Sequence, residues 1–187
     1  MTQKAIIVSA PSGAGKSTLV RHLMDSLPQL AFSVSACTRQ PRPGETDGRD
    51  YYFLSAEKFR EHIEACDFIE WEEVYPGNFY GTLKLEIRRI WSSDKIPVFD
   101  VDVMGGLNLK KYFRRHGLAI FIQPPSLEVL KTRLEDRATE SAESLSKRIS
   151  KAEQELRFAA KFDTIVNNND LDSAKQNLLE LVTSFLR

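Results

Sequence analysis

Residues 10–17 have the composition and spacing of a loop that binds phosphate groups. They read Ala-Pro-Ser-Gly-Ala-Gly-Lys-Ser, with alanine where this pattern usually begins with glycine. Small residues allow backbone N–H groups to curl around a phosphate, and the following helix adds partial positive charge. Lys16 is expected to reach the β- and γ-phosphates of a nucleotide, and the Ser17 hydroxyl to contact Mg²⁺. The residues expected to contact this nucleotide are Pro11, Ser12, Gly13, Ala14, Gly15, Lys16, Ser17 and Thr18.

This loop alone does not identify the reaction, since motor proteins, molecular switches and small-molecule kinases share it. The Asn-Lys-x-Asp string with which GTPases read their base is absent from the sequence. A chain of 187 residues is also short for a typical motor ATPase. The sequence therefore favours a kinase that phosphorylates a small acceptor.

Short apolar runs on both sides of this loop predict the strands of a parallel sheet. They span residues 5–8, 97–101, 118–122 and 164–166. Their continuous apolar character is typical of strands that are covered on both faces. Between them, apolar residues recur at helical spacing, as in Leu19, Leu23 and Leu27. Alternating strands and helices predict an α/β fold with right-handed crossovers.

Two segments interrupt this alternation. Residues 35–82 contain a Pro- and Gly-rich turn and half-exposed strands, which predict an inserted antiparallel subdomain. Residues 133–157 are helical, dense in Arg, Lys and Glu, and poor in apolar anchors, so we expect a solvent-facing arm. The chain is therefore divided into a core of residues 1–34, 83–124 and 158–187, an inserted subdomain of residues 35–82, and a lid with flanking helices at 125–157.

Composition narrows the partners and the compartment. Lys and Arg together number 26, as do Asp and Glu, and this balance argues against a protein that binds a nucleic acid duplex. Cys37 and Cys66 lack metal-binding or redox spacing, so we expect buried or partly buried free thiols in a reducing compartment. No apolar run approaches the roughly 20 residues of a membrane span, and residues 5–8 are too few for a signal peptide. We expect a cytoplasmic monomer or homodimer.

Ordered motifs across nearly the whole chain resemble those of the guanylate kinase family. Besides the phosphate loop, they are residues 33–45, 48–53, 68–71, 78–82, 99–102, 133–140 and 165–167. The resemblance implies a P-loop three-layer sandwich with a parallel core sheet, a small mixed or antiparallel GMP-binding subdomain and a helical lid. It also implies direct in-line transfer of the ATP γ-phosphoryl group to GMP, and to dGMP, with Mg²⁺ as cofactor. The partners would be these small molecules, with no nucleic acid and no membrane.

The resemblance assigns the phosphate of GMP to the Pro- and Gly-rich turn. Arg39 and Arg42 would hold it together, because guanidinium groups form bidentate hydrogen bonds with a dianionic phosphate. The hydroxyls of Tyr51 and Tyr80 would assist them. Arg39 is also expected to take part in catalysis.

The guanine base would be read by a carboxylate. N1–H and the N2 amine of guanine are adjacent donors, which Glu70 would accept, whereas adenine presents a lone pair at N1. The hydroxyls of Ser35 and Thr82 and the carboxylate of Asp102 would contact the rest of the acceptor. Threonine at position 82 departs from the family, which often has serine there.

The metal would be held where a predicted strand ends. Asp100 and Asp102 follow the apolar run at residues 97–99, on one face of that strand. Carboxyl ends of strands are where open α/β sheets bind ligands. The resemblance implies that Asp100 holds Mg²⁺ through a water molecule, together with Ser17. Capping of the turn after Asp102 is the structural alternative.

Arginines of the lid would supply charge to the transferring phosphoryl group. Arg133 and Arg137 lie one helical turn apart, and Arg148 follows further along the same run. Arg137 and Arg148 would be catalytic together with Lys16, and Arg133 and Arg137 would contact ATP. Asn167 would lie near adenine, in a run of asparagines with one more polar residue than the family pattern.

Two other functions stay open. A non-catalytic guanylate-kinase-like module for protein interaction has the same fold, but the chain keeps Lys16, Ser17, Arg137 and Arg148. A P-loop kinase of another small phosphorylated acceptor would not need Glu70 with its neighbouring hydroxyls. Both alternatives are therefore less favoured than a kinase of GMP.

Overall fold

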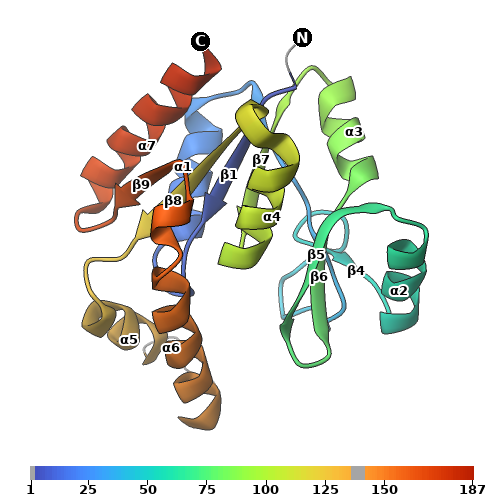
Figure 1. Ribbon diagram of the computed structural model, residues 1–187, viewed down its shortest axis with the longest axis horizontal. Coiled ribbons are helices and arrows are strands. Elements are labelled where there is room, and N and C mark those ends of the chain that lie inside the picture. The colour runs from blue at the N-terminus through green and yellow to red at the C-terminus, as the bar shows by residue number, and fades with distance from the viewer. Residues whose placement is uncertain (1–2, 136–141) are drawn as a thin grey trace.

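The computed structural model describes residues 3–135 and 142–187. The core of the fold is a parallel sheet of 5 strands in the order β2-β7-β1-β8-β9 (Figure 1). The strands are β1 (Ala5–Ser9), β2 (Leu30–Phe32), β7 (Ile96–Val101), β8 (Gly117–Gln123) and β9 (Thr164–Asn167). In the middle of the sheet, Val8 of β1 pairs with Asp100 on one side and with Ile120 on the other. The phosphate loop, which follows β1, therefore starts beside Asp100.

Helices cover both faces of this sheet and make three layers (Figure 1). Ile6 and Val8 of β1 point into one apolar cluster, whereas Ala5 and Ile7 point into another. The first cluster packs α1 (Lys16–Ser26), α5 (Leu127–Glu135) and α7 (Leu171–Leu186). The second packs α3 (Lys84–Ser92) and α4 (Val103–Phe113). The predicted α/β sandwich with a parallel core sheet is confirmed.

A second sheet lies beside the core, on the right in Figure 1. Its strands, in the order β4-β3-β6-β5, are β3 (Ala36–Cys37), β4 (Tyr52–Phe53), β5 (Phe68–Tyr75) and β6 (Asn78–Leu83). β3 and β4 are parallel and the other pairs are antiparallel, so the sheet is mixed. Helix α2 (Ala56–Glu64) packs on it through Phe59, whose ring stacks on that of Phe68 with centroids 4.4 Å apart. These two rings and Ala36 form a small apolar cluster of their own.

The charged run near the end of the chain packs more closely than predicted. The run forms helix α6 (Ala142–Leu156), which is followed by the 3₁₀ turn η2 (Ala159–Lys161) and then by β9. A similar 3₁₀ turn, η1 (Arg114–His116), precedes β8. Ala152 and Glu155 of α6 are buried, and Ile149 packs against the first cluster. The prediction of a solvent-facing arm is wrong for this part of the helix, because its apolar residues contact the core.

The two cysteines differ in burial. Cys37 is fully buried in β3, as predicted. Cys66 is exposed, so the prediction of a buried or partly buried thiol is wrong there. Cys66 follows the C-cap of α2 and has a φ of 56°, which turns the chain out of the helix and leaves the side chain in solvent. Within the described part of the chain, we find no helix with the length and apolar character needed to cross a membrane.

Candidate active site

A cavity of about 1210 Å³ opens at the carboxyl edge of the core sheet. The phosphate loop, the second sheet and α6 each contribute to its walls. It brings together most of the residues predicted from the sequence: residues 11–18, Ser35, Arg39, Arg42, Tyr51, Glu70, Tyr80, Asp100, Asp102 and Arg148. Among the predicted residues that the structure describes, Thr82, Arg133 and Asn167 lie outside the lining. Arg137 is outside the described residues.

The phosphate loop depends on its second glycine. Gly15 has a φ of 90° and precedes α1 directly. Such a left-handed backbone favours glycine, and a Cβ atom here would lie only 2.6 Å from Nδ2 of Asn168. Ala10, by contrast, is 4% exposed and belongs to the first apolar cluster. The first residue of the loop therefore packs its methyl group against the core.

Lys16 and Ser17 share one carboxylate at the start of α1. The Lys16 ammonium contacts Oδ1 of Asp100, and the Ser17 hydroxyl donates a hydrogen bond of 3.0 Å to Oδ2 of the same residue. Burial lowers the pKa of Lys16 to about 8, while the charges of Asp102 and Glu155 oppose this shift. The Lys16 ammonium, the Ser17 hydroxyl and the Asp100 carboxylate therefore meet where the phosphates of a nucleotide would lie. The hydroxyl and carboxylate oxygens are ligands that suit Mg²⁺.

Asn168, rather than Asn167, touches the phosphate loop. The Asn168 amide is 4% exposed and donates a hydrogen bond of 2.7 Å to the carbonyl of Ala14. Asn167 ends β9 with an exposed side chain. The sequence could not separate the two, because the asparagine run gives no pattern that fixes which member turns inward.

Exchanging Asn168 for alanine is expected to loosen the loop and weaken ATP binding. The change leaves the Ala14 carbonyl buried without its partner, which costs about 1–3 kcal/mol of stability. We expect a lower melting temperature and a higher KM for ATP, with a smaller change in the KM for GMP. Asn167→Ala is the matched control for the loop contact, and an equal loss of stability in both variants would contradict the assignment.

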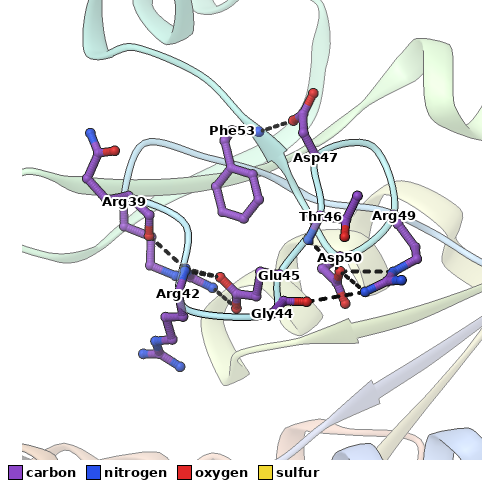
Figure 2. A network of polar contacts seen from close by, with 10 residues as sticks. Arg39, Arg42, Gly44, Glu45, Thr46, Asp47, Arg49, Asp50 and Phe53 are labelled. Carbon is purple, nitrogen blue, oxygen red and sulfur yellow. Dashed lines mark hydrogen bonds and ion pairs between the residues drawn. The ribbon is translucent and has the colours of Figure 1, made fainter.

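Arg39 is held by a carboxylate that the sequence analysis missed. Its two terminal nitrogens donate to the two oxygens of Glu45, each at 2.6 Å, and the backbone N–H of Arg42 donates to Glu45 at 2.7 Å (Figure 2). The hydrogen bonds from Arg39 hold the pKa of Glu45 at about 2. The side chain of Arg42 extends away from this pair (Figure 2). Glu45 therefore fixes the Arg39 fork at the cavity wall.

Two tyrosines complete this wall. The Arg39 guanidinium lies 4.7 Å from the ring centroid of Tyr51, whose ring meets that of Tyr80 edge-on at 6.0 Å. Burial raises the pKa of both hydroxyls, although Arg39 opposes the shift. Both tyrosines thus stay protonated and able to donate hydrogen bonds to an anion near Arg39.

Glu70 and Thr82 form a buried polar pair across the β5–β6 ladder. They are register partners, and the Thr82 hydroxyl donates a hydrogen bond of 2.7 Å to Oε1 of Glu70. Thr82 is fully buried behind the carboxylate, which explains why it does not line the cavity itself. Burial raises the pKa of Glu70 to about 7, and the nearby charge of Asp102 adds to this. The second carboxylate oxygen of Glu70 has no hydrogen bond from Thr82 and can accept from a ligand.

Asp102 is also the N-cap of α4. Its Oδ1 accepts a hydrogen bond of 2.8 Å from the N–H of Gly105. A Cβ atom on Gly105 would lie 3.0 Å from that oxygen and 3.2 Å from Oε2 of Glu70, so the helix backbone closely approaches both carboxylates. The capping role considered from the sequence is present, and Asp102 also lines the cavity, with its Oδ2 lying 3.7 Å from Nζ of Lys151.

One lid arginine reaches the donor side of the cavity. Arg148 of α6 donates a hydrogen bond of 2.7 Å to the hydroxyl of Ser12 in the phosphate loop. Arg133 of α5 is partly buried outside the cavity lining. The structure therefore brings Arg148, but not Arg133, to the phosphate loop.

These features define a P-loop phosphotransferase in which a phosphate loop and a separate pocket for an acceptor face one cavity. The family model described as guanylate kinase matches residues 2–185. The guanylate kinase of Bacteroides fragilis is 48% identical over 98% of this chain and 90% of its own, and that of Porphyromonas gingivalis is 48% identical over 98% of both chains. A solved guanylate kinase from Anaplasma phagocytophilum superposes with a TM-score of 0.79 at 26% identity, over 98% of this chain and 86% of that one. The chain belongs to the guanylate kinase family, a family of ATP:GMP phosphotransferases.

Proposed function

We propose that this protein transfers the γ-phosphoryl group of ATP to GMP and to dGMP, with Mg²⁺ as cofactor, and releases ADP and GDP or dGDP. The observation that carries the proposal is the buried Glu70 carboxylate, which faces the same cavity as the Lys16 ammonium. A carboxylate with a free acceptor oxygen suits the adjacent N–H donors of guanine. A paired ammonium and hydroxyl at a helix N-terminus suit the phosphates of ATP.

The proposed transfer is direct and in line, without a covalent enzyme intermediate. The acceptor oxygen of GMP is already an anion near neutral pH, so the enzyme needs to position it and to neutralise charge. Lys16 would bind the β- and γ-phosphates, while Arg39 and Arg42 would hold the acceptor phosphate with Tyr51 and Tyr80. Arg148 and Arg137 would add charge from the lid.

Ser17 and Asp100 are the residues that would hold Mg²⁺, Asp100 through a water molecule. A Mg²⁺ ion held by these residues would supply positive charge that offsets the negative charge of the ATP phosphates. The proposed GMP site also includes Ser35, Thr82 and Asp102. The proposed ATP site also includes residues 11–18, Arg133 and Asn167.

The proposal divides the chain into three parts. They are a core of residues 1–34, 83–124 and 158–187, a GMP-binding subdomain of residues 35–82 and a lid of residues 125–157. The enzyme would work in the cytoplasm as a monomer or homodimer, with no nucleic acid or membrane partner.

A coupled assay of ADP release tests the proposal. ATP and Mg²⁺ are supplied with GMP, dGMP, AMP, CMP, UMP or a ribose phosphate, and a reaction without acceptor gives the background. Turnover restricted to GMP and dGMP is the expected result. Folded protein that binds ATP without turning over any acceptor would point to an interaction module, and preference for another acceptor would refute the guanine site.

A further inference from the structure

Lys151 lies where α6, the second sheet and the core sheet meet. Its Nζ donates a hydrogen bond of 3.2 Å to the carbonyl of Val74 in β5. The same atom lies 3.7 Å from Oδ2 of Asp102, which follows β7, and 3.8 Å from Oε1 of Glu155 on its own helix. One ammonium group therefore joins three parts of the fold, and the sequence analysis did not single it out.

The contact with β5 uses a carbonyl at an irregularity in the ladder. β5 and β6 pair Glu73 with Phe79 and Tyr75 with Asn78, and the register shifts between these pairs at Val74. A bulge of this kind turns a backbone group away from the neighbouring strand. Lys151 meets the Val74 carbonyl there, and its ammonium also lies 4.8 Å from the centroid of the Tyr75 ring. Cation–π attraction adds to the hydrogen bond.

The charge of Lys151 acts on several carboxylates. Glu155 is 7% exposed, and its burial raises its pKa to about 7, an effect that the Lys151 charge opposes. Burial and the charge of Asp102 raise the pKa of Glu72 in β5, and the Lys151 charge again opposes the shift. Without Lys151, carboxylates from α6, β5 and the end of β7 would face one another around the cavity. The Lys151 ammonium offsets this repulsion, together with that of Lys16, whose charge also acts on Glu155.

Hydrogen bonds join the β5–β6 hairpin to Thr38, the residue before Arg39. At the tip of the β5–β6 hairpin, the Gly77 carbonyl accepts a hydrogen bond of 3.2 Å from the Thr38 hydroxyl, which in turn accepts one of 2.9 Å from the N–H of Phe79. The N–H of Thr38 also donates to the carbonyl of Phe79 at 3.0 Å. Arg39 is the next residue, so the hairpin holds the backbone from which the Arg39 side chain extends to Glu45.

On the other side, α6 contacts the phosphate loop. Arg148 lies one helical turn before Lys151, on the same face of the helix, and donates to Ser12. The helix thus touches the donor loop through Arg148 and the acceptor hairpin through Lys151. A rigid helix with two such contacts fixes the spacing between the two halves of the cavity.

We propose that Lys151 is a positioning residue, which ties the β5–β6 hairpin to α6 and Asp102 and thereby sets the distance from Arg39 to the phosphate loop. The inference rests on the proposed function. In-line transfer requires contact between the acceptor and donor phosphates, so the rate depends on the distance from Arg39 to the phosphate loop. Lys151 need not touch either substrate to act in this way.

Lys151→Met, which keeps the length of the side chain and removes its charge, tests the role in catalysis. Losing a hydrogen bond to a charged group predicts a fall of about tenfold in kcat/KM for GMP, with the KM for ATP changed less than about twofold. Lys151→Arg keeps the charge and is expected to recover most of the loss. Lys131→Met is the matched control, because Lys131 pairs with Glu153 of α6 at 3.9 Å but does not reach the hairpin. Unchanged kinetics in Lys151→Met, or an equal loss in Lys131→Met, would overturn the proposal.

A distance measurement separates this inference from the proposed function. Spin labels at Ser150→Cys on α6 and Pro76→Cys in the hairpin, in a Cys66→Ser background, report the spacing by double electron–electron resonance. Lys151→Met is expected to lengthen or broaden the distance distribution while Lys131→Met leaves it unchanged, and a circular dichroism melt verifies folding. Identical distributions in all variants would refute the tether even if GMP is the substrate. Wild-type protein that fails to phosphorylate GMP would instead refute the proposed function.

Discussion

Lys16→Ala is expected to lower kcat for phosphorylation of GMP by about 10³-fold and to leave the protein folded. Removing one preorganised charge from a phosphoryl-transfer site has an effect of this order. The Lys16 ammonium meets Asp100 and Ser17 at the first turn of α1, where no other described lysine contacts Asp100. Burial lowers the pKa of Lys16 to about 8, so holding this charge costs the fold stability and its removal should not unfold the protein.

The measurement is the ADP-release assay at saturating ATP and GMP, together with a thermal melt. Lys131→Ala serves as the control, since it removes a lysine from an exposed ion pair outside the cavity. We expect both variants to melt within a few degrees of the wild type. Near-normal turnover in Lys16→Ala would rule out the phosphate-loop assignment, whereas an unfolded variant would show a structural role for this lysine.

Glu70→Gln is expected to raise the KM for GMP about 10²-fold while the KM for ATP changes less than about twofold. The amide keeps the shape of the carboxylate but turns one acceptor oxygen into a donor, which then opposes a guanine N–H. The Thr82 hydroxyl can still donate to the remaining oxygen, so the β5–β6 ladder is expected to keep its structure. Initial rates with each nucleotide varied in turn give both constants. Equal losses for GMP and ATP would mean that Glu70 supports the fold rather than the base.

The same residue predicts a pH dependence. Burial raises the pKa of Glu70 to about 7, so its acceptor form predominates at pH 8 and is in the minority at pH 6. In the wild type, kcat/KM for GMP should therefore fall as the pH decreases below 7, by about tenfold per unit. Glu70→Gln should lose this decline and keep only the one caused by protonation of the GMP phosphate near pH 6. An unaltered profile in the variant would contradict the role of the carboxylate.

The regular part of the fold could be predicted because its causes are local. The strands of the parallel sheet are apolar on both faces. The spacing of Gly, Lys and Ser in the phosphate loop is required by few other structures, so it identifies the loop. β2 was missed, since a strand of 3 residues is too short to give a pattern. The packing of α6 was mispredicted because its apolar contacts, such as Ala152, are sparse among charges.

The parts of the site that escaped prediction arise from tertiary contacts. Glu45 turns back onto Arg39 only because the Pro- and Gly-rich turn folds the chain on itself. Lys151 lies far along the sequence from Val74, and nothing in either segment indicates that the two meet. Asn168 is distinguished from Asn167 only by the direction in which the chain leaves β9. Residue type and spacing identify the groups that meet a substrate better than the groups that hold those residues in place.

The small apolar cluster of the second sheet affects how readily this part of the protein unfolds locally. Ala36, Phe59 and Phe68 are its buried members, whereas each face of the core sheet rests on a far larger cluster. Local stability follows buried apolar contacts, so this sheet should open at a lower free energy than the core, as a cooperative unit of its own. A nucleotide bound against it would then raise the free energy of that local opening while leaving the core almost unaffected.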